Sequence, residues 1–369
     1  MNQYMITILL LVCVVFASIE HRTHPKFRVS VYFISAFLFS LLFAFRNPIT
    51  TRDTAVYVEI FQRSAFDGNW FSRIDRYEGG YCFLNRIVHL FTDNPVVLFF
   101  LISILSYCIL FRVLDITKEK STSCFYPISF ICLYTSYFGQ LYNGIVMRAC
   151  LAISFIYLSC VYFSEKKIFI GILTYIIACS FHQSAILAFL LPIIFYKGIS
   201  ISKNKAYIFT AILLIAYLMG VSSYTSQFLG SSINLLTSQF PSIQLFRWGQ
   251  LMIEERGFDI EASVALSRIF YFFLLFFIIK NETHRECSGY VISSIVALFI
   301  LTFFGNFSLT VRVADYYLIA IIFAFIRLLS QKRVNLNLIS SPKIIINSTI
   351  ILVLVSVFFS YLFLSNVVS

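Results

Sequence analysis

The chain has 369 residues, of which 59% are hydrophobic and only 12% are charged. A soluble domain carries about a quarter charged residues, so a water-soluble fold could not hide this much apolar surface. Apolar stretches of about 17 to 25 residues, long enough to cross a hydrocarbon core of roughly 30 Å, recur along nearly the whole sequence. The composition therefore predicts an all-α, polytopic bundle of transmembrane helices and excludes a soluble enzyme.

The formal net charge is +11, which in a soluble protein would point to a nucleic-acid partner. Here the basic residues lie in short segments between apolar stretches, the pattern of cytoplasmic loops in membrane proteins. The positions of the basic residues therefore predict the membrane topology of the chain, and no nucleic-acid partner is expected.

The apolar stretches predict about 12 spans. We place them at about residues 4–19, 30–46, 94–112, 123–140, 142–163, 168–181, 183–196, 206–222, 263–279, 288–305, 309–327 and 344–364. The sixth and seventh are short for full crossings, so they form either two spans or one re-entrant hairpin. Either arrangement returns the chain to the same side.

The lysines predict the orientation of the spans. Placing the basic segment 21–30 in the cytoplasm puts all eleven lysines of the chain on that side. Two long polar segments, 47–80 and 223–262, then form loops on the opposite side, and both contain arginine but no lysine. Long polar loops outside a membrane bundle usually cover or form a site. We expect residues 1–369 to form a single membrane domain with its active face away from the cytoplasm.

The outer end of the second expected span carries a charged cluster. Arg46, Arg52 and Asp53 lie within eight residues of chain. Arginine suits a phosphate because its planar guanidinium donates two parallel hydrogen bonds and stays charged. We therefore expect a phosphate-binding cluster with a carboxylate nearby; the alternative is that Arg46 only reaches for the membrane interface.

A second cluster closes the same loop. Arg76 and Glu78 precede two glycines, Gly79 and Gly80, which places a carboxylate on flexible backbone at the membrane surface. Such a carboxylate either acts as a general base for a sugar hydroxyl or binds hydroxyls by hydrogen bonds. An ordinary solvated loop would contain the same residues, and the motif alone does not distinguish a functional carboxylate from such a loop.

Arg148 interrupts 142–163, a stretch that is otherwise without charge. An arginine within the hydrocarbon costs several kcal/mol unless it faces a wet cavity or the interior of the bundle and has an anionic partner. The expected topology places Arg148 about one and a half turns from the outer end of its span. This depth suits a lipid-linked diphosphate.

His182 falls at the outer turn between the sixth and seventh expected spans, followed by Gln183 and Ser184. A lone histidine is more often a structural residue than a catalyst, and here both roles are open. The amide and hydroxyl that follow it suit a sugar or a phosphate. No second histidine or cysteine lies at a spacing that predicts a metal site.

Arg312 begins the eleventh expected span, and Asp315 follows three positions later. On a helix this spacing puts both side chains on one face, so a local ion pair is the simpler explanation. The functional alternative is an arginine directed at the outer cavity.

The sequence resembles the EpsG/Wzy group of bacterial polysaccharide polymerases. The similarity rests on an ordered set of segments between about residues 40 and 320. These are Phe45-Arg46 followed by Arg52-Asp53-Thr54 and Tyr57, then Tyr77-Glu78-Gly79-Gly80-Tyr81, Met147-Arg148 followed by Leu151-Ala152, Phe181-His182-Gln183-Ser184, and Arg312 with Tyr316-Tyr317. No single segment is diagnostic, and the part from 223 to 262 has no match.

The resemblance implies an O-antigen or capsule polymerase of the broad GT-C type in the bacterial inner membrane, with a periplasmic active face. Such an enzyme moves a growing chain from undecaprenyl diphosphate onto a new lipid-linked repeat unit, without a metal or cofactor. A chain-length regulator protein is a candidate partner.

The resemblance also implies roles for individual residues. Glu78, Asp53 or His182, in that order, would orient or deprotonate the acceptor hydroxyl. The residues expected to bind diphosphate or sugar are Arg46, Arg52, Tyr57, Arg76, Arg148, Gln183 and Arg312.

Three alternatives remain at this point. An O-antigen ligase uses the same donor with a different acceptor, and its long outer loop would correspond to 223–262. A transporter or flippase would favour internal repeats and binding groups near the bilayer midplane, and no clear repeat is present. A membrane O-acetyltransferase is supported only by the single histidine near a membrane face.

Overall fold

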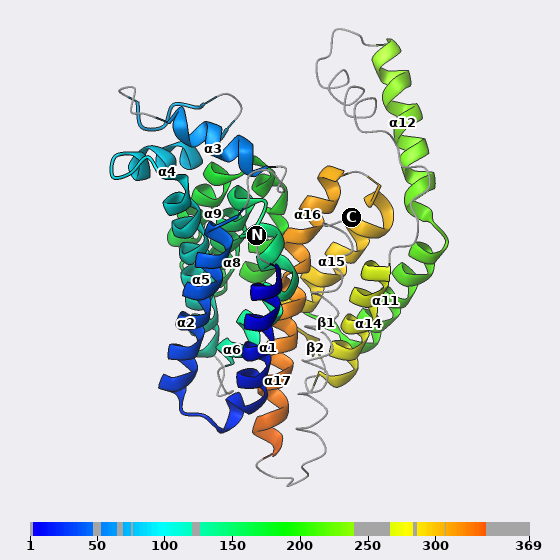
Figure 1. Ribbon diagram of the computed structural model, residues 1–369. Helices are drawn as coiled ribbons and strands as arrows, with labels where there is room; N and C mark the ends of the chain where they lie inside the picture. The colour runs from blue at the N-terminus through cyan, green and yellow to red at the C-terminus, as the bar shows by residue number, and fades with distance from the viewer. Residues whose placement is uncertain are drawn as a thin grey trace. The chain divides into compact units, whose positions relative to one another are not determined.

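A computed structural model of the chain describes residues 3–46, 53–64, 69–74, 77–119, 126–239, 266–282, 286–306 and 308–336. Within these residues the chain is predominantly helical, with one short pair of strands (Figure 1). The predicted helical class is therefore confirmed. Contacts divide the chain into two compact units, residues 1–198 with 325–369 and residues 199–324, and each is described here by itself.

The first unit contains the helices that carry most of the candidate residues. They are α1 (Gln3–Ile19), η1 (Glu20–Arg22), α2 (Pro25–Ala44), α3 (Thr54–Gln62), α4 (Gly79–His89), α5 (Pro95–Glu119), α6 (Pro127–Tyr134), η2 (Thr135–Gly139), α7 (Gln140–Tyr142), α8 (Met147–Ser164), α9 (Ile168–Phe181), η3 (Gln183–Ala188) and α10 (Leu190–Lys197).

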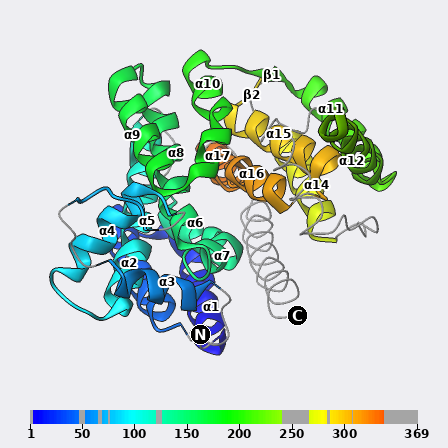
Figure 2. The same ribbon diagram turned by 90° about the horizontal axis from the view of Figure 1, so that it is seen from above.

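The long helices of this unit run side by side in alternating directions, and the short helices α3 and α4 lie across one end of them (Figure 1). Figure 2 looks down on this end and shows α3 and α4 beside the ends of α2 and α5. We call it the α3–α4 end. The short connections at η1 and between α8 and α9 lie at the opposite end of the unit. Lys26 near the start of α2 and Lys166 after the end of α8 lie at the ends of these helices away from Ala44 and Arg148, and the orientation in the membrane stays a prediction.

Three described helices are long and apolar enough to cross a membrane: Pro25–Ala44, Pro95–Thr117 and Met147–Ser164. A fourth would result if α11 and α12 of the second unit, which meet at a bend of 71°, form one span. Shorter apolar helices are Tyr4–Ile19, Ile168–Phe181, Gln183–Lys197 and Gly289–Phe304. The total of about 12 spans stays a prediction, and the last expected span, 344–364, lies outside the described residues.

The expected pair at 168–196 forms two antiparallel segments, α9 and the combined η3 and α10. A tight turn with Lys166 at φ 62° joins α8 to α9. The far end of α9 returns to the level where α8 begins, since His182 and Arg148 both contact Glu78. α9 therefore covers nearly the same depth as α8, although its 14 residues reach only about 21 Å.

The described parts of both expected outer loops contain helix. α3 and the first two residues of α4 fall within 47–80, and most of α12 falls within 223–262. The sequence of these segments is polar and shows no long apolar stripe, so it predicts loops outside the membrane and gives no sign of the helices within them. The remainder of 223–262, from residue 240 onward, lies outside the described residues.

The second unit contains β1 (Ile201–Ser202), α11 (Lys203–Leu218), α12 (Val221–Gln239), α14 (Leu266–Asn281), β2 (Glu286–Cys287), α15 (Gly289–Phe304) and α16 (Ser308–Leu318), and α17 (Ala320–Leu336) begins in it. The two strands pair antiparallel, with Ile201 opposite Cys287. Where α15 ends, Arg268 donates a hydrogen bond to the carbonyl of Gly305 at 3.1 Å.

In the first unit, a non-helical interruption between α7 and α8 determines where α8 begins. The chain leaves α7 at Asn143 and resumes helix at Met147. At Gly144 an added Cβ would overlap the carbonyl oxygen of Gln140, so only glycine fits this turn. The Asn143 amide donates to Ser103 Oγ at 3.0 Å and accepts from the Tyr134 hydroxyl at 3.1 Å.

Arg46 caps this break. Its guanidinium donates to the carbonyls of Gly144 at 2.8 Å, Asn143 at 3.0 Å and Phe43 at 3.0 Å. Its Cζ lies 4.5 Å from the centre of the Phe99 ring. These bonds satisfy carbonyls at a helix end, which would otherwise lack partners. The structure thus gives Arg46 a capping role, and its expected contact with phosphate stays a prediction.

We expect Arg46→Lys to lower the free energy of unfolding by about 2–4 kcal/mol, because one ammonium group cannot reach three carbonyls that a guanidinium spans. The measurement is thermal or denaturant unfolding of the purified protein in detergent. Arg63→Lys is the control, since Arg63 and its partner Glu59 are both largely exposed and such pairs contribute under about 1 kcal/mol. Equal effects of the two changes would contradict the capping role.

Candidate functional site

Glu78 is brought to the bundle by the two glycines that follow it. It is the N-cap residue of α4, with φ −69° and ψ 145°. An added Cβ at Gly80 would overlap Ser180 Oγ and lie 2.8 Å from the Ser180 carbonyl oxygen. Glycine is a poor helix former, so its use here follows from the close approach. The first turn of α4 therefore packs directly on the end of α9.

Three segments meet at the Glu78 carboxylate. Oε1 accepts a hydrogen bond from the backbone N–H of Gln183 at 2.9 Å and lies 3.3 Å from His182 Nδ1. Oε2 accepts a hydrogen bond from Arg148 Nη1. Glu78 is only 7% exposed, and a buried carboxylate needs such partners to offset its lost hydration. The start of α4, the start of α8 and the end of α9 are thereby fixed to one another.

Arg148 is the second residue of α8 and is largely buried. Besides its bond to Glu78, its Cζ lies 4.4 Å from the centre of the Tyr77 ring, a cation–π distance. The Tyr57 hydroxyl is a further neighbour of the guanidinium. Nε of Arg148 is buried and has no hydrogen-bond partner among the described residues. The site therefore contains a cation with unused donor capacity.

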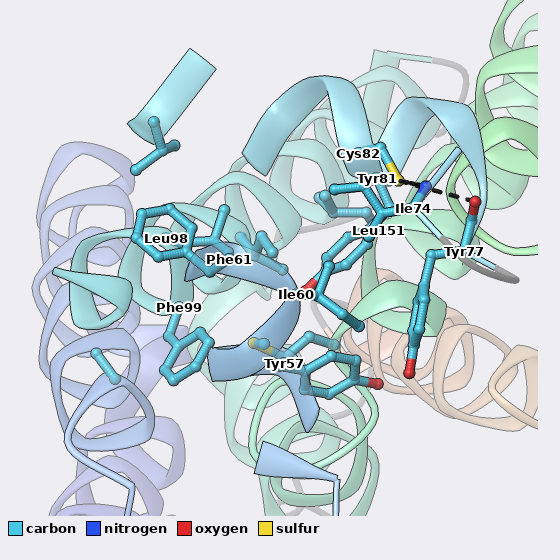
Figure 3. Packing of buried hydrophobic residues seen from close by; sticks show 14 residues of the cluster. Tyr57, Ile60, Phe61, Ile74, Tyr77, Tyr81, Cys82, Leu98, Phe99 and Leu151 are labelled. Carbon is cyan, nitrogen blue, oxygen red and sulfur yellow. Dashed lines mark hydrogen bonds between the residues drawn. The ribbon is translucent and has the colours of Figure 1, made fainter. Parts of the chain in front are cut away.

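Tyrosine rings form one wall of the site. The ring centres of Tyr57 and Tyr81 lie 5.9 Å apart, and those of Tyr77 and Tyr81 lie 6.2 Å apart. In Figure 3 the Tyr57 hydroxyl points away from Phe61 and Leu98, toward the side of the cluster where Tyr77 lies. The Tyr81 hydroxyl is buried without a described partner. All three rings are buried, so this wall supports the polar groups of the site from behind.

Arg86 supports this wall from the other face of α4. Its Nη1 donates to the Ser72 carbonyl at 2.8 Å and to the Trp70 carbonyl at 3.1 Å. The ring of Phe71 stacks on Phe83 at 4.7 Å between centres. The sequence reasoning missed Arg86; an arginine inside an otherwise apolar short helix was the available signal. The segment 69–74 is thereby attached to α4.

The charge state of Glu78 follows from its neighbours. Burial raises the pKa of the carboxyl group, but the hydrogen bond from His182 and the charge of Arg148 outweigh it and lower the pKa to about 2. Glu78 is therefore ionised at neutral pH. Such a carboxylate is a weak proton acceptor and a strong hydrogen-bond acceptor.

The structure brings together five of the expected site residues: Tyr57, Glu78, Arg148, His182 and Gln183. Gln183 contributes its backbone N–H, while its side chain is exposed.

The other expected residues lie elsewhere or are not described. Asp53 is partly exposed at the start of α3, and its charge acts on Tyr57 one turn later. Arg46 caps the helix break. Arg312 is exposed on α16 in the second unit. Arg52 and Arg76 lie outside the described residues. Within the described part of the chain, no group of three or more His, Cys, Asp or Glu side chains gathers at metal-binding distance.

The EpsG family model matches residues 29–368, nearly the whole chain. The chain therefore belongs to the EpsG family, and the resemblance stated from its motifs is confirmed. Family membership and the apolar helices identify a membrane protein of polysaccharide biosynthesis. A search of the curated proteins and a search of the solved structures each gave no match.

The lowered pKa of Glu78 predicts a pH dependence. A carboxylate whose folded pKa is about 2, against an ordinary 4.5, contributes stability that is complete above the ordinary value and is lost as the pH falls through the folded value. We expect Glu78→Gln to lower the melting temperature by a constant amount between about pH 5 and pH 8, and by less below about pH 4. Thermal unfolding in detergent across this range measures it.

Glu59→Gln is the control, because within the described residues Glu59 forms an exposed ion pair with Arg63. It should leave the melting temperature nearly unchanged at every pH. If the melting temperature of Glu78→Gln falls further below that of the wild type as the pH decreases, the assignment of Glu78 as a paired anion is contradicted.

Proposed function

We propose that this EpsG-family protein is a polysaccharide polymerase that joins undecaprenyl-diphosphate-linked repeat units of an O-antigen or capsule. The observation that carries the proposal is Arg148: a largely buried cation at the start of a helix, held by Glu78, whose Nε has no described partner. A buried donor of this kind is satisfied by a water molecule or by an anionic oxygen of a ligand.

The departing diphosphate is the group that Arg148 would bind. Breaking the bond between the anomeric carbon and the phosphate oxygen leaves negative charge on the diphosphate. A guanidinium stabilises that charge through paired hydrogen bonds, and the positive end of the α8 dipole adds to the same field. In this proposal Arg148 stabilises the leaving group without proton transfer.

Glu78 would hold the Arg148 guanidinium in its binding position before the substrate arrives. In the absence of substrate its carboxylate neutralises Arg148 and fixes the guanidinium against the Tyr77 ring. A charged side chain held in place before the substrate arrives does not need to reorganise during the reaction.

The position of the site agrees with a substrate that approaches from outside. The site lies at the α3–α4 end of the first unit (Figure 1), whereas Lys26 near the start of α2 and Lys166 after the end of α8 lie at the other ends of their helices. We therefore propose a periplasmic active face in the bacterial inner membrane, by the positive-inside bias. Lipid-linked oligosaccharides would reach the site from the membrane, and a chain-length regulator is a proposed partner.

The test is the sugar ladder of a deletion strain. We expect the deletion to leave lipopolysaccharide core with a single repeat unit and no long chains. The wild-type gene should restore the ladder, Arg148→Ala should not, and Arg148→Lys should restore it in part because a point charge replaces a two-pronged donor. Arg63→Ala is the matched control and should restore it fully.

The outcomes separate the rival functions. A core without any repeat unit would indicate a ligase, and an unchanged ladder would contradict the polymerase. A full ladder with Arg148→Ala at normal membrane level would contradict the role given to Arg148.

A further inference from the structure

We infer that Nε2 of His182 accepts the proton of the acceptor hydroxyl, and that Glu78 is a positioning residue that holds the imidazole by its other nitrogen. This inference rests on the proposed function, since it assigns the proton transfer of the same reaction. It reverses the order of candidates that the sequence suggested, in which Glu78 came first.

The two nitrogens of His182 have different surroundings. Nδ1 lies 3.3 Å from Oε1 of Glu78, and an ionised carboxylate only accepts hydrogen bonds. The proton of the neutral ring is therefore on Nδ1, which leaves a lone pair on Nε2. No described residue forms a hydrogen bond with Nε2. A carboxylate placed in this way fixes the tautomer and the orientation of the ring.

The backbone holds the ring in this orientation. His182 ends α9 in an extended conformation, with φ −152° and ψ 119°. Its N–H donates to Ala178, and its carbonyl accepts from Ala185 at 3.0 Å. The next N–H, that of Gln183, donates to the same Glu78 oxygen that faces Nδ1. The imidazole and the carboxylate are therefore positioned by one short stretch of chain.

The other candidates are less suited to accept a proton. Both oxygens of Glu78 already accept hydrogen bonds, and Arg148 stabilises its ionised form. Asp53 is partly exposed at the start of α3 and shows no hydrogen bond to Glu78, Arg148 or His182 in the described structure. His182, in contrast, is 9% exposed and lies within the same cluster as Arg148.

The reaction balances with these groups alone. A lone pair of the acceptor oxygen forms the new bond to the anomeric carbon, and the hydroxyl proton passes to Nε2. The electron pair of the broken bond between the anomeric carbon and oxygen stays on the diphosphate, beside Arg148. The imidazolium is stabilised by Glu78 and later releases its proton to solvent or to the diphosphate.

The experiment is rescue with imidazole. Protein purified in detergent is supplied with the lipid-linked repeat units that accumulate in the deletion strain, and chain length and released lipid diphosphate are measured. We expect His182→Gly to lose about 100-fold or more in kcat, with little change in KM for the donor. Added imidazole should restore at least about tenfold, because it can occupy the space of the missing ring.

Two further variants separate proton transfer from structure. His182→Gln keeps a donor for Glu78 but has no basic nitrogen, so it should remain inactive. Glu78→Gln should lose about 10–100-fold, and Glu78→Asp should retain more activity than Glu78→Gln. His89→Gln is the matched control, since His89 pairs with the largely exposed Asp93, and it should be active.

Each outcome decides a separate point. If the wild-type protein does not join the repeat units, the proposed function fails. If the wild type is active and His182→Gln or His182→Gly is equally active, this inference alone fails. It also fails if imidazole does not restore His182→Gly while that variant keeps the wild-type melting temperature.

Discussion

A buried carboxylate connects the segments that make up the site. Glu78 accepts hydrogen bonds from the start of α8 and the end of α9, while it belongs to the start of α4. Removing a carboxylate from water costs several kcal/mol, which only close and complete pairing offsets. The three helix ends must therefore meet at one point for the carboxylate to be stable there. This constraint determines where Arg148, His182 and the tyrosine wall lie.

The same constraint explains the irregular backbone around the site. α8 must begin deep enough to present Arg148 to Glu78, so the chain breaks between Asn143 and Met147. Arg46 satisfies the carbonyls that the break exposes. α4 must approach α9 closely, which requires Gly80. The two arginines thus have different partners: Arg46 binds the backbone carbonyls at the break, and Arg148 binds the Glu78 carboxylate.

Part of this arrangement was predictable from sequence. Arg148 was expected to face an anionic partner because it interrupts an apolar stretch, and Glu78 and His182 were singled out independently of it. Their meeting was not predictable, because Glu78 lies 70 residues from Arg148 and 104 from His182. Periodicity and composition predict which face of a helix is buried. Whether two residues so far apart in the sequence come into contact depends on how the helices pack.

Other features of the site have no clear signal in the sequence. A cation at the end of a span looks the same whether it caps carbonyls, as Arg46 does, or binds phosphate, which stays a prediction. Arg86 was missed, since its partners are backbone carbonyls of 70 and 72 that carry no sequence signal. The helix α3 and most of α12 fall within the two segments predicted as outer loops, because the polarity of these segments predicts their place outside the membrane and does not reveal a helix by an apolar stripe.

The most direct test of the central claim is a double-mutant cycle on the Glu78–Arg148 pair. Glu78→Gln, Arg148→Gln and the double variant are compared by their free energies of unfolding in detergent. If Glu78 holds α4 to α8 through this pair, each single change should cost about 3–5 kcal/mol, and the double change should cost at least about 1.5 kcal/mol less than their sum. If the cost of the double change equals the sum of the two single costs to within about 0.5 kcal/mol, the account is contradicted.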